Sequence, residues 1–169
     1  MKKEVILMVG NVGSGKTTWI KQYLQNKNEI QLTTFVVSKD DIRKMLSGGG
    51  YVFDELLEPA IDTWDKHMIS TLLNLGKNVI VDETNMTVGR RFEIIQWVRN
   101  HVEEEVCVKA VVMHPISKAD SIRRKSKPET CYGATPDIWE MVWQRFDDEF
   151  VTPTESEGFA EIVNVGVKN

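Results

Sequence analysis

The sequence has few cysteines, no long apolar run and no excess of positive charge. Cys107 and Cys131 are the two cysteines among 169 residues. They do not make a disulfide framework, and a reducing, cytoplasmic location fits them best. The apolar run Val5–Val9 is far shorter than the roughly 20 residues of a membrane helix, so neither a membrane span nor a signal peptide is expected. The net charge of −4 argues against a protein that coats nucleic acid through bulk charge.

The composition is that of an ordinary globular protein. Hydrophobic residues make up 41% and charged residues 27% of the chain, which is enough to bury a core and unlike a disordered segment. There is no internal repeat and no low-complexity tract, and Ser47–Gly50 is too short to link domains. One domain over residues 1–169 is therefore expected, with no prediction of its oligomeric state.

Short apolar runs alternate with segments of helical periodicity. Strands are expected at Lys3–Val9, Thr33–Ser38, Asn78–Val81, Val106–Met113 and Ile162–Val165. Helices are expected at Lys16–Gln25, Asp41–Leu46, Asp54–Leu75, Arg90–His101, Lys118–Lys125 and Pro136–Phe150. In the long helix at 54–75, the spacing predicts an apolar stripe of Ile61, Trp64, Met68 and Leu72. This alternation indicates an α/β fold, with a mainly parallel sheet of about five strands and helices on both faces.

A glycine-rich loop joins the first expected strand to the first expected helix. Residues Gly10–Thr17 read Gly-Asn-Val-Gly-Ser-Gly-Lys-Thr and fit the pattern G-x-x-x-x-G-K-[ST] at each fixed position. Glycines let successive backbone N–H groups face an anion, and the helix N-terminus adds partial positive charge. The loop therefore predicts binding of a nucleoside triphosphate, with Lys16 reaching the β- and γ-phosphates and the Thr17 hydroxyl binding Mg²⁺.

Nine consecutive residues are assigned to the nucleotide, which we expect to be ATP. They are Gly10, Asn11, Val12, Gly13, Ser14, Gly15, Lys16, Thr17 and Thr18. GTPases, ATPases and small kinases share such a loop, so the loop alone does not identify the phosphate acceptor. The sequence has no N-K-x-D guanine motif after a strand and is short for a motor ATPase, which favours a phosphotransferase.

Two carboxylates follow the second expected strand. Ligands of open α/β sheets lie at the carboxyl ends of the strands, so Asp40 or Asp41 is expected to face the γ-phosphate. A kinase of hydroxyl groups needs a carboxylate there to accept the proton of the acceptor. We assign Asp40 as this general base and Asp41 as the N-cap of the next helix, with Arg43 near the mouth of the cleft. Capping alone is the alternative explanation for the pair.

The third expected strand also ends in acidic residues, Asp82 and Glu83. A carboxylate beside a phosphate loop can hold Mg²⁺ directly or through water. Asp82 is the better candidate because it directly follows the apolar run, and Glu83 is its competitor. The remaining alternative is that the carboxylate simply stands at the start of the loop and binds no metal.

The segment 116–127 is basic. It has Lys118, Arg123, Arg124, Lys125 and Lys127 against the single acid Asp120, a net charge of +4. Such a patch, within a predicted lid at about 116–134, can close over ATP and bring an arginine to the transferring phosphate. A solvated helix face is the alternative reading.

Five segments together resemble the 5′-kinase domain of polynucleotide kinases, within the wider group of small P-loop kinases that includes zeta toxins. The matching segments are G-x-x-G-S-G-K-T-T-W at Gly10–Trp19, S-K-D-D-I-R at Ser38–Arg43, V-I-V-D-E-T-N at Val79–Asn85 followed by Arg90-Arg91, the basic Arg123–Lys127, and the tail Phe150–Phe159 with its E-G-F. The resemblance extends from about residue 3 to residue 165. Pro128 stands near the place where the family often has a second lid arginine.

The resemblance implies an ATP- and Mg²⁺-dependent kinase of the repair type, which phosphorylates a 5′-OH end of DNA or RNA. It implies that Asp40 activates the hydroxyl, that Arg43 holds the 3′-phosphate of the acceptor, and that Arg123 or Arg124 comes from the lid. The sequence has no D-x-D-x-T phosphatase motif. A kinase of a small metabolite or nucleoside, and an ATP-dependent switch without transfer, are the alternatives. Tyr51 and Phe53 near the cleft are weaker candidates for stacking on an acceptor base.

Overall fold

The computed structural model describes residues 3–25 and 33–166. Five strands form one parallel sheet in the order β2-β3-β1-β4-β5. Their bounds are β1 Lys3–Val9, β2 Thr34–Val37, β3 Asn78–Val81, β4 Val106–Met113 and β5 Glu161–Val165. The predicted α/β fold with about five parallel strands is confirmed.

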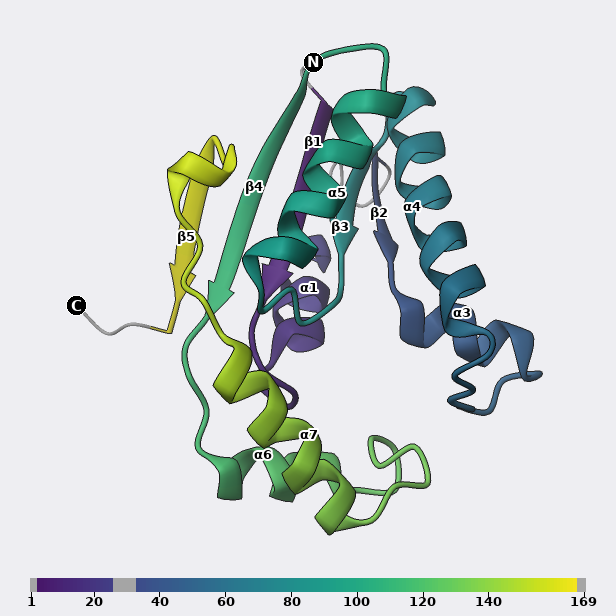
Figure 1. Ribbon diagram of the computed structural model, residues 1–169, viewed down its shortest axis with the longest axis vertical. Helices are drawn as coiled ribbons and strands as arrows, with labels where there is room; N and C mark the ends of the chain where they lie inside the picture. The colour runs from purple at the N-terminus through teal and green to yellow at the C-terminus, as the bar shows by residue number, and fades with distance from the viewer. Residues whose placement is uncertain (1–2, 26–32, 167–169) are drawn as a thin grey trace.

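Helices connect the strands and extend beyond one end of the sheet. They are α1 Lys16–Gln25, α3 Lys39–Leu46, α4 Glu58–Asn74, α5 Val88–His101, α6 Lys118–Lys125, α7 Pro136–Glu149 and the short 3₁₀ helix η1 Glu155–Glu157. Figure 1 shows α4 and α5 on one face of the sheet and α1 behind it, with α6 and α7 below the strand ends. Helices therefore cover both faces, as the alternating sequence pattern predicted.

The two faces of the sheet are built from alternate residues of the same strands. Val5, Leu7 and Val9 of β1 belong to the core cluster that contains residues of α4 and α5. Ile6 and Met8, which point the other way, pack with Ile20 of α1. Because successive strand residues face opposite sides, a continuous apolar strand such as β1 supplies both cores, which is typical of parallel sheets with helices on both faces.

Helix α4 buries a face that differs in part from the one that its spacing predicted. The residues buried on α4 include Ile61, Asp65, Ile69 and Leu73, four apart. Trp64 is 43% exposed and Met68 is 42% exposed, so neither belongs to the core. The predicted stripe holds for Ile61, which is buried, and for Leu72, which packs partly buried against the core. It was wrong for Trp64 and Met68 because it followed the large apolar side chains, whereas the buried stripe includes an aspartate.

Helix α3 begins two residues earlier than predicted. Its N-cap is Ser38, and Asp40 and Asp41 both lie in its first turn. The prediction that Asp41 is the N-cap was therefore wrong. Two carboxylates in the first turn still stabilise the helix, because they face the positive end of its dipole.

The C-terminal segment is tied to the loop that follows β3. Arg91 of α5 is fully buried, and it donates two hydrogen bonds to Glu157 of η1, at 2.7 and 2.9 Å. It also donates to the backbone carbonyls of Asn85 and Met86, at 3.0 Å each. The carbonyl of Thr84 in the same loop accepts from the N–H of Gly10. The tail therefore helps to position the start of the glycine-rich loop.

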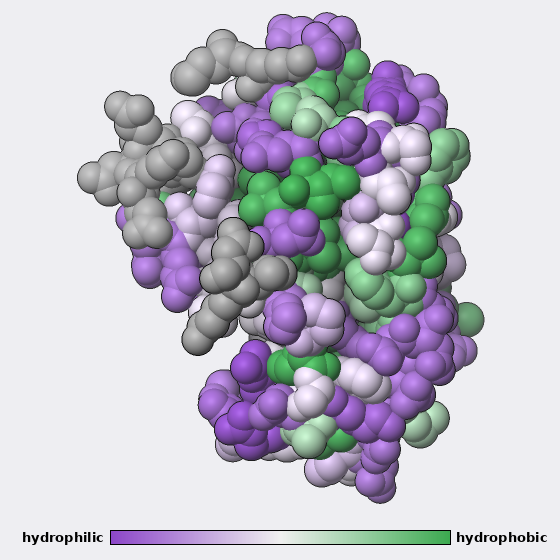
Figure 2. All heavy atoms as spheres, turned by 90° about the vertical axis from the view of Figure 1, so that its left-hand side faces the viewer, coloured by the Kyte–Doolittle hydropathy of each residue, from purple (hydrophilic) through white to green (hydrophobic). Residues whose placement is uncertain are grey.

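The side of the molecule formed by β5 has no uniform chemical character. Figure 2 shows apolar residues in its upper half, interrupted and surrounded by hydrophilic ones. The ion pairs of Lys109 with Glu4 and Glu161, at 2.7 and 3.0 Å, join the three strands β1, β4 and β5 on this part of the sheet. Among the described residues, no helix is long and apolar enough to cross a lipid bilayer.

Candidate active site

The glycine-rich loop between β1 and α1 is packed against α6. Gly13 has a φ of +71°, a left-handed conformation that favours glycine. A Cβ atom at Gly13 would meet Ser121 of α6 at 3.1–3.2 Å. The buried Ser121 hydroxyl donates to the carbonyl of Val12 at 2.7 Å. Glycine at position 13 thus permits both the turn and the close approach of α6.

Lys16 lies at the first position of α1 and folds back over the loop. Its Nζ donates to the carbonyls of Gly10 and Asn11, at 2.8 and 3.0 Å. Burial, helped by the nearby charge of Lys125, lowers the pKa of Lys16 to about 8 against the opposing charges of Asp82 and Asp40. The ammonium group is therefore held beside the loop that is expected to bind phosphates.

Thr17 and Asp82, the two predicted metal ligands, are in direct contact. The Thr17 hydroxyl donates to Asp82 Oδ2 at 2.8 Å. Burial raises the pKa of Asp82, and the bond from Thr17 and the charge of Lys16 partly offset this rise. A hydroxyl and a carboxylate paired beside a phosphate loop are a donor set that suits Mg²⁺, which uses one or two protein ligands together with phosphate oxygens. Among the described residues, no group of three or more His, Cys, Asp or Glu gathers as a metal site.

Glu83, the competitor of Asp82, is engaged elsewhere. It accepts from Arg90 at 3.1 Å, and Lys39 lies 3.9 Å away. Arg90 also contacts Asp62 at 2.7 Å and the fully buried Asp65 at 3.1 Å. This arrangement favours Asp82 as the carboxylate that faces the nucleotide.

A cluster of charged groups joins α3, α4, the segment after β3 and α5 behind the site. Its members are Lys39, Asp62, Asp65, Glu83 and Arg90. The Asp62 carboxylate accepts from Lys39 at 2.6 Å, and Lys66 lies at 2.6 Å, so its cationic neighbours lower the pKa of Asp62 against the effect of burial. Burial, then the charge of Glu83, raise the pKa of Asp65 to about 8. Sequence reasoning missed this cluster, although an acidic residue within the apolar spacing of α4 was a usable signal.

Asp40 is held by an arginine that is itself held by a glutamate. Arg43 Nη1 donates to Asp40 Oδ1 at 2.7 Å. The Nε and Nη2 atoms of Arg43 donate to the two carboxylate oxygens of Glu58, at 2.9 and 2.6 Å. These partners raise the pKa of Arg43 against the effect of burial. The geometry fixes the orientation of Asp40 from α3 and α4 together, and Glu58 was not foreseen from the sequence.

One large cleft contains most of the predicted site residues. It has a volume of about 1590 Å³ and lies at the carboxyl ends of the strands. Its lining includes Lys16, Thr17, Asp40, Arg43 and Asp82. The structure therefore brings together residues from the glycine-rich loop and from the ends of β2 and β3, as expected for ligand sites of open α/β sheets.

The basic helix α6 contributes to this cleft unevenly. Arg124 lines the cleft and donates to the carbonyl of Gly13 at 3.0 Å. Lys125 and Lys127 also line it. Arg123 is not among the lining residues and instead pairs with Asp120 of its own helix at 2.5 Å. Of the two candidate arginines, Arg124 is thus the one that faces the loop.

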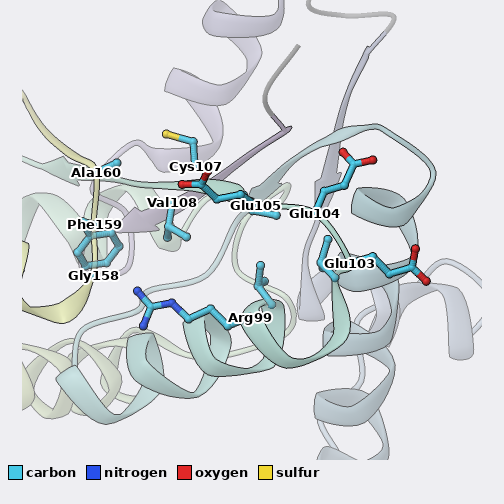
Figure 3. Close-up of a pocket in the computed structure, with 12 residues that line it drawn as sticks. Arg99, Glu103, Glu104, Glu105, Cys107, Val108, Gly158, Phe159 and Ala160 are labelled. Atoms are coloured by element: carbon cyan, nitrogen blue, oxygen red, sulfur yellow. The ribbon is translucent and has the colours of Figure 1, made fainter.

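A second cavity lies at the other end of the sheet. Its volume is about 490 Å³, and it is lined by the end of α5, the start of β4 and the segment around Phe159. Figure 3 shows Arg99 pointing towards Gly158 and Phe159, while Glu103 and Glu104 extend outwards. Cys107 of β4 is partly exposed and lines this cavity. The cavity is acidic and lies at the amino end of β4, so it does not suit phosphates.

Comparison with known proteins assigns the chain to a family. A model of the AAA domain family AAA_33 matches residues 5–153. A protein of Acanthamoeba polyphaga mimivirus, which carries the name of a bifunctional polynucleotide phosphatase/kinase, is 24% identical over 166 residues. The match covers 97% of this chain and 33% of the viral protein, so the chain spans about a third of that relative.

Solved structures share the fold. A chain of the Pnkp1/Rnl/Hen1 RNA repair complex matches with a TM-score of 0.65 and 17% identity, over 89% of this chain and 47% of that one. The APS kinase CysC of Mycobacterium tuberculosis matches with a TM-score of 0.61 and 14% identity, over 99% and 91% of the two chains. The fold is that of P-loop kinases, and the sequence resemblance to a polynucleotide-kinase-like domain is confirmed.

Proposed function

Because this chain belongs to the AAA domain family AAA_33, with the fold of P-loop kinases, we propose that it transfers the γ-phosphate of ATP to a 5′-OH end of DNA or RNA. The observation that carries the proposal is the oriented Asp40 carboxylate, held by Arg43 in the same cleft as Lys16, Thr17 and Asp82. The name of the viral relative supports a polynucleotide as the acceptor.

The donor side of the reaction rests on the glycine-rich loop. We expect the backbone N–H groups of Gly13, Gly15 and the start of α1 to face the phosphates, and Lys16 to supply positive charge. Thr17 and Asp82 would hold Mg²⁺, which neutralises charge on the phosphates when it is bound. Arg124 lies against the loop at Gly13, on α6 of the proposed lid at 116–134, from where it can stabilise charge that develops during transfer.

The acceptor side rests on Asp40. Its carboxylate takes the proton of the acceptor hydroxyl while that oxygen forms a bond to the γ-phosphorus and the bond to the β-γ bridging oxygen breaks. The products are ADP and the 5′-phosphorylated strand, with no covalent enzyme intermediate. Among the described residues, each terminal nitrogen of Arg43 donates one hydrogen bond to a carboxylate oxygen. Each has two hydrogens, so a second N–H on each can reach a phosphate of the acceptor.

A kinase of a nucleoside or another small molecule is the second candidate. The shared fold of the mycobacterial APS kinase favours it, and so do the two carboxylates that already surround Arg43. The Arg43→Ala variant separates the two candidates. Under our proposal it lowers kcat on both acceptors because Arg43 holds Asp40, and it raises KM for a 3′-phosphorylated mononucleotide much more than KM for the plain nucleoside. Equal changes in the two KM values favour the small-molecule kinase.

The proposal is tested by incubating the protein with γ-labelled ATP and a panel of acceptors. The panel contains 5′-OH DNA, 5′-OH RNA, the same strands with a 5′-phosphate, and nucleosides. We expect label on the 5′-OH strands and none on the strands that are already phosphorylated. Label on nucleosides alone contradicts the polynucleotide acceptor, and ATP binding without any labelled product contradicts a kinase.

A further inference from the structure

Two tyrosines from distant parts of the chain stack on each other across the cleft. The ring centroids of Tyr51 and Tyr132 are 4.5 Å apart, and the ring planes differ by 13°. Tyr51 follows the glycines after α3, and Tyr132 lies in the loop between α6 and α7. Both rings are half-buried and line the cleft that contains Asp40. The stack thus joins the acceptor side of the cleft to the proposed lid.

Cationic groups surround the faces of these rings. Lys125 Nζ lies 4.3 Å from the ring centroid of Tyr132 and 4.1 Å from that of Trp139. Lys44 Nζ lies 5.2 Å from Tyr132, and the guanidinium of Arg43 lies 5.8 Å from Tyr51. All are within the roughly 6 Å over which a cation is attracted to a ring face. Aromatic faces beside cations are the combination that binds a base together with its phosphates.

The backbone at Tyr132 is held in an uncommon conformation. Tyr132 has a φ of +50° and is followed by Gly133 with a φ of +76°. Bulky residues seldom adopt this left-handed region. The preceding turn is fixed by the N–H of Cys131, which donates to the carbonyl of Lys127 at 2.8 Å. The loop therefore presents the Tyr132 ring to the cleft instead of leaving it in solvent.

The position of the stack assigns it to the acceptor and not to ATP. Tyr51 lies beside Arg43, which contacts Asp40, whereas the ATP phosphates are expected at the loop 10–15. Burial, together with the charge of Asp40, raises the pKa of Tyr51 to about 12, so the phenol stays uncharged near neutral pH. An uncharged ring close to the proposed base does not repel a negatively charged strand.

We infer that Tyr51 and Tyr132 form the binding site for the terminal nucleobase of the acceptor strand, and that this nucleotide must be unpaired. The inference rests on the proposed function. A base enters between the rings when the two loops separate by about 3.4 Å, the rise of one base. Such a base has both faces covered by tyrosine, so it cannot remain stacked in a duplex, and a paired end must first open.

The test compares acceptors that differ only at the first nucleotide. Three 5′-OH substrates are used: a single strand, the same strand with an abasic 5′-terminal nucleotide, and a blunt hairpin duplex. In the unmodified protein, KM for the abasic strand is expected to exceed KM for the intact strand about 5- to 150-fold, the effect of losing one base stack. KM for the blunt duplex is expected to rise about tenfold or more.

Substitutions of the two tyrosines then test whether they cause the difference in KM between intact and abasic strands. In Tyr51→Leu and Tyr132→Leu, the KM for the abasic strand divided by the KM for the intact strand falls towards 1. Tyr51→Phe keeps this ratio because the ring face remains. Phe92→Leu, which changes an exposed aromatic residue of α5 outside the cleft lining, is the matched control. An unchanged dissociation constant of ATP shows that each variant is folded. If the leucine variants do not fold, the comparison of intact and abasic strands in the unmodified protein decides whether the terminal base contributes to binding.

The outcomes separate the inference from the function on which it rests. Equal KM values for intact and abasic strands, or a ratio that the leucine variants leave unchanged, overturn the base-binding site while the polynucleotide kinase stands. Phosphorylation of nucleosides without any strand overturns both. An intact-to-abasic preference that the tyrosine variants abolish, with the duplex disfavoured, supports the inference.

Discussion

The two sides of the cleft are held together by different kinds of interaction. The donor side, which consists of the loop 10–15, Lys16, Thr17 and α6, is fixed largely by backbone groups, such as the carbonyls that bind Lys16, Ser121 and Arg124. The acceptor side, which consists of α3, Glu58 and the segment around Tyr51, is fixed by ion pairs and ring contacts between side chains.

This difference explains why one side can be recognised as a motif and the other cannot. Backbone contacts depend on local conformation, so eight consecutive residues are enough to specify them. Side-chain pairs depend on which helices pack together, so Glu58 and Tyr132 are set by tertiary structure. We expect substitutions on the acceptor side to reduce transfer while ATP affinity is retained, and the predictions below test that separation.

The largest effect is expected at Asp40. The Asp40→Asn variant removes the group that takes the proton and is expected to reduce kcat by about 10²- to 10⁴-fold, with little change in ATP affinity. Asp41→Asn is the matched control, since Asp41 is exposed and pairs with Lys44 of its own helix. Equal losses in both variants, or a weakened ATP complex in Asp40→Asn alone, would break the proposed separation of the two sides.

The next effect concerns the support that the tail gives to the donor side. Removing Glu157 leaves Arg91 buried without its carboxylate, so Glu157→Ala is expected to lower the free energy of unfolding by about 3–5 kcal/mol. Urea unfolding measures this free energy, and Glu155→Ala, which changes an exposed residue of the same 3₁₀ helix, is the control. Hydrogen bonding to Arg91 lowers the pKa of Glu157 against the effect of burial. The stabilisation by this pair is therefore lost as pH falls below the ordinary range of a glutamate.

A smaller effect is expected at Glu58, which positions the base through Arg43. Glu58→Gln weakens the bidentate contact and is expected to lower kcat about tenfold, the scale of one charge-assisted hydrogen bond. Because Glu58 does not face ATP in this account, the dissociation constant of ATP stays within about twofold. A change confined to ATP affinity would show that Glu58 belongs functionally to the donor side. Steady-state kinetics at saturating ATP provide the measurement.

The smallest effect on transfer is expected at Asp65, which lies behind the acceptor side and changes stability instead. Because its pKa in the folded protein is raised to about 8, the folded state binds a proton that the unfolded chain releases at lower pH. This contribution to stability is complete below about pH 4 and is lost as pH rises towards 8. Asp65→Asn removes the titration and flattens the slope of stability against pH, by up to about 1.4 kcal/mol per pH unit. An unchanged slope, matching the exposed control Asp137→Asn, counts against this assignment.

The sequence predicted the fold more completely than the site. All five strands began and ended within one residue of their predicted bounds because continuous apolar runs flanked by glycine or polar residues define them, and β2 was one residue shorter at each end. Helix α4 was placed partly on the wrong face because buried Asp65 interrupts the apolar spacing. A carboxyl group is buried only with polar or charged partners from elsewhere, and those partners, Arg90 and Glu83, are brought close by packing.

The central claim is that both sides of the cleft act together on a 5′-hydroxyl. The most direct measurement maps the position of label on an oligonucleotide that has free hydroxyl groups at both ends, after incubation with γ-labelled ATP. The account predicts that all label lies on the 5′ oxygen and that a strand already phosphorylated there takes none. Label at the 3′ end, or transfer to small molecules with no label on any strand, contradicts it.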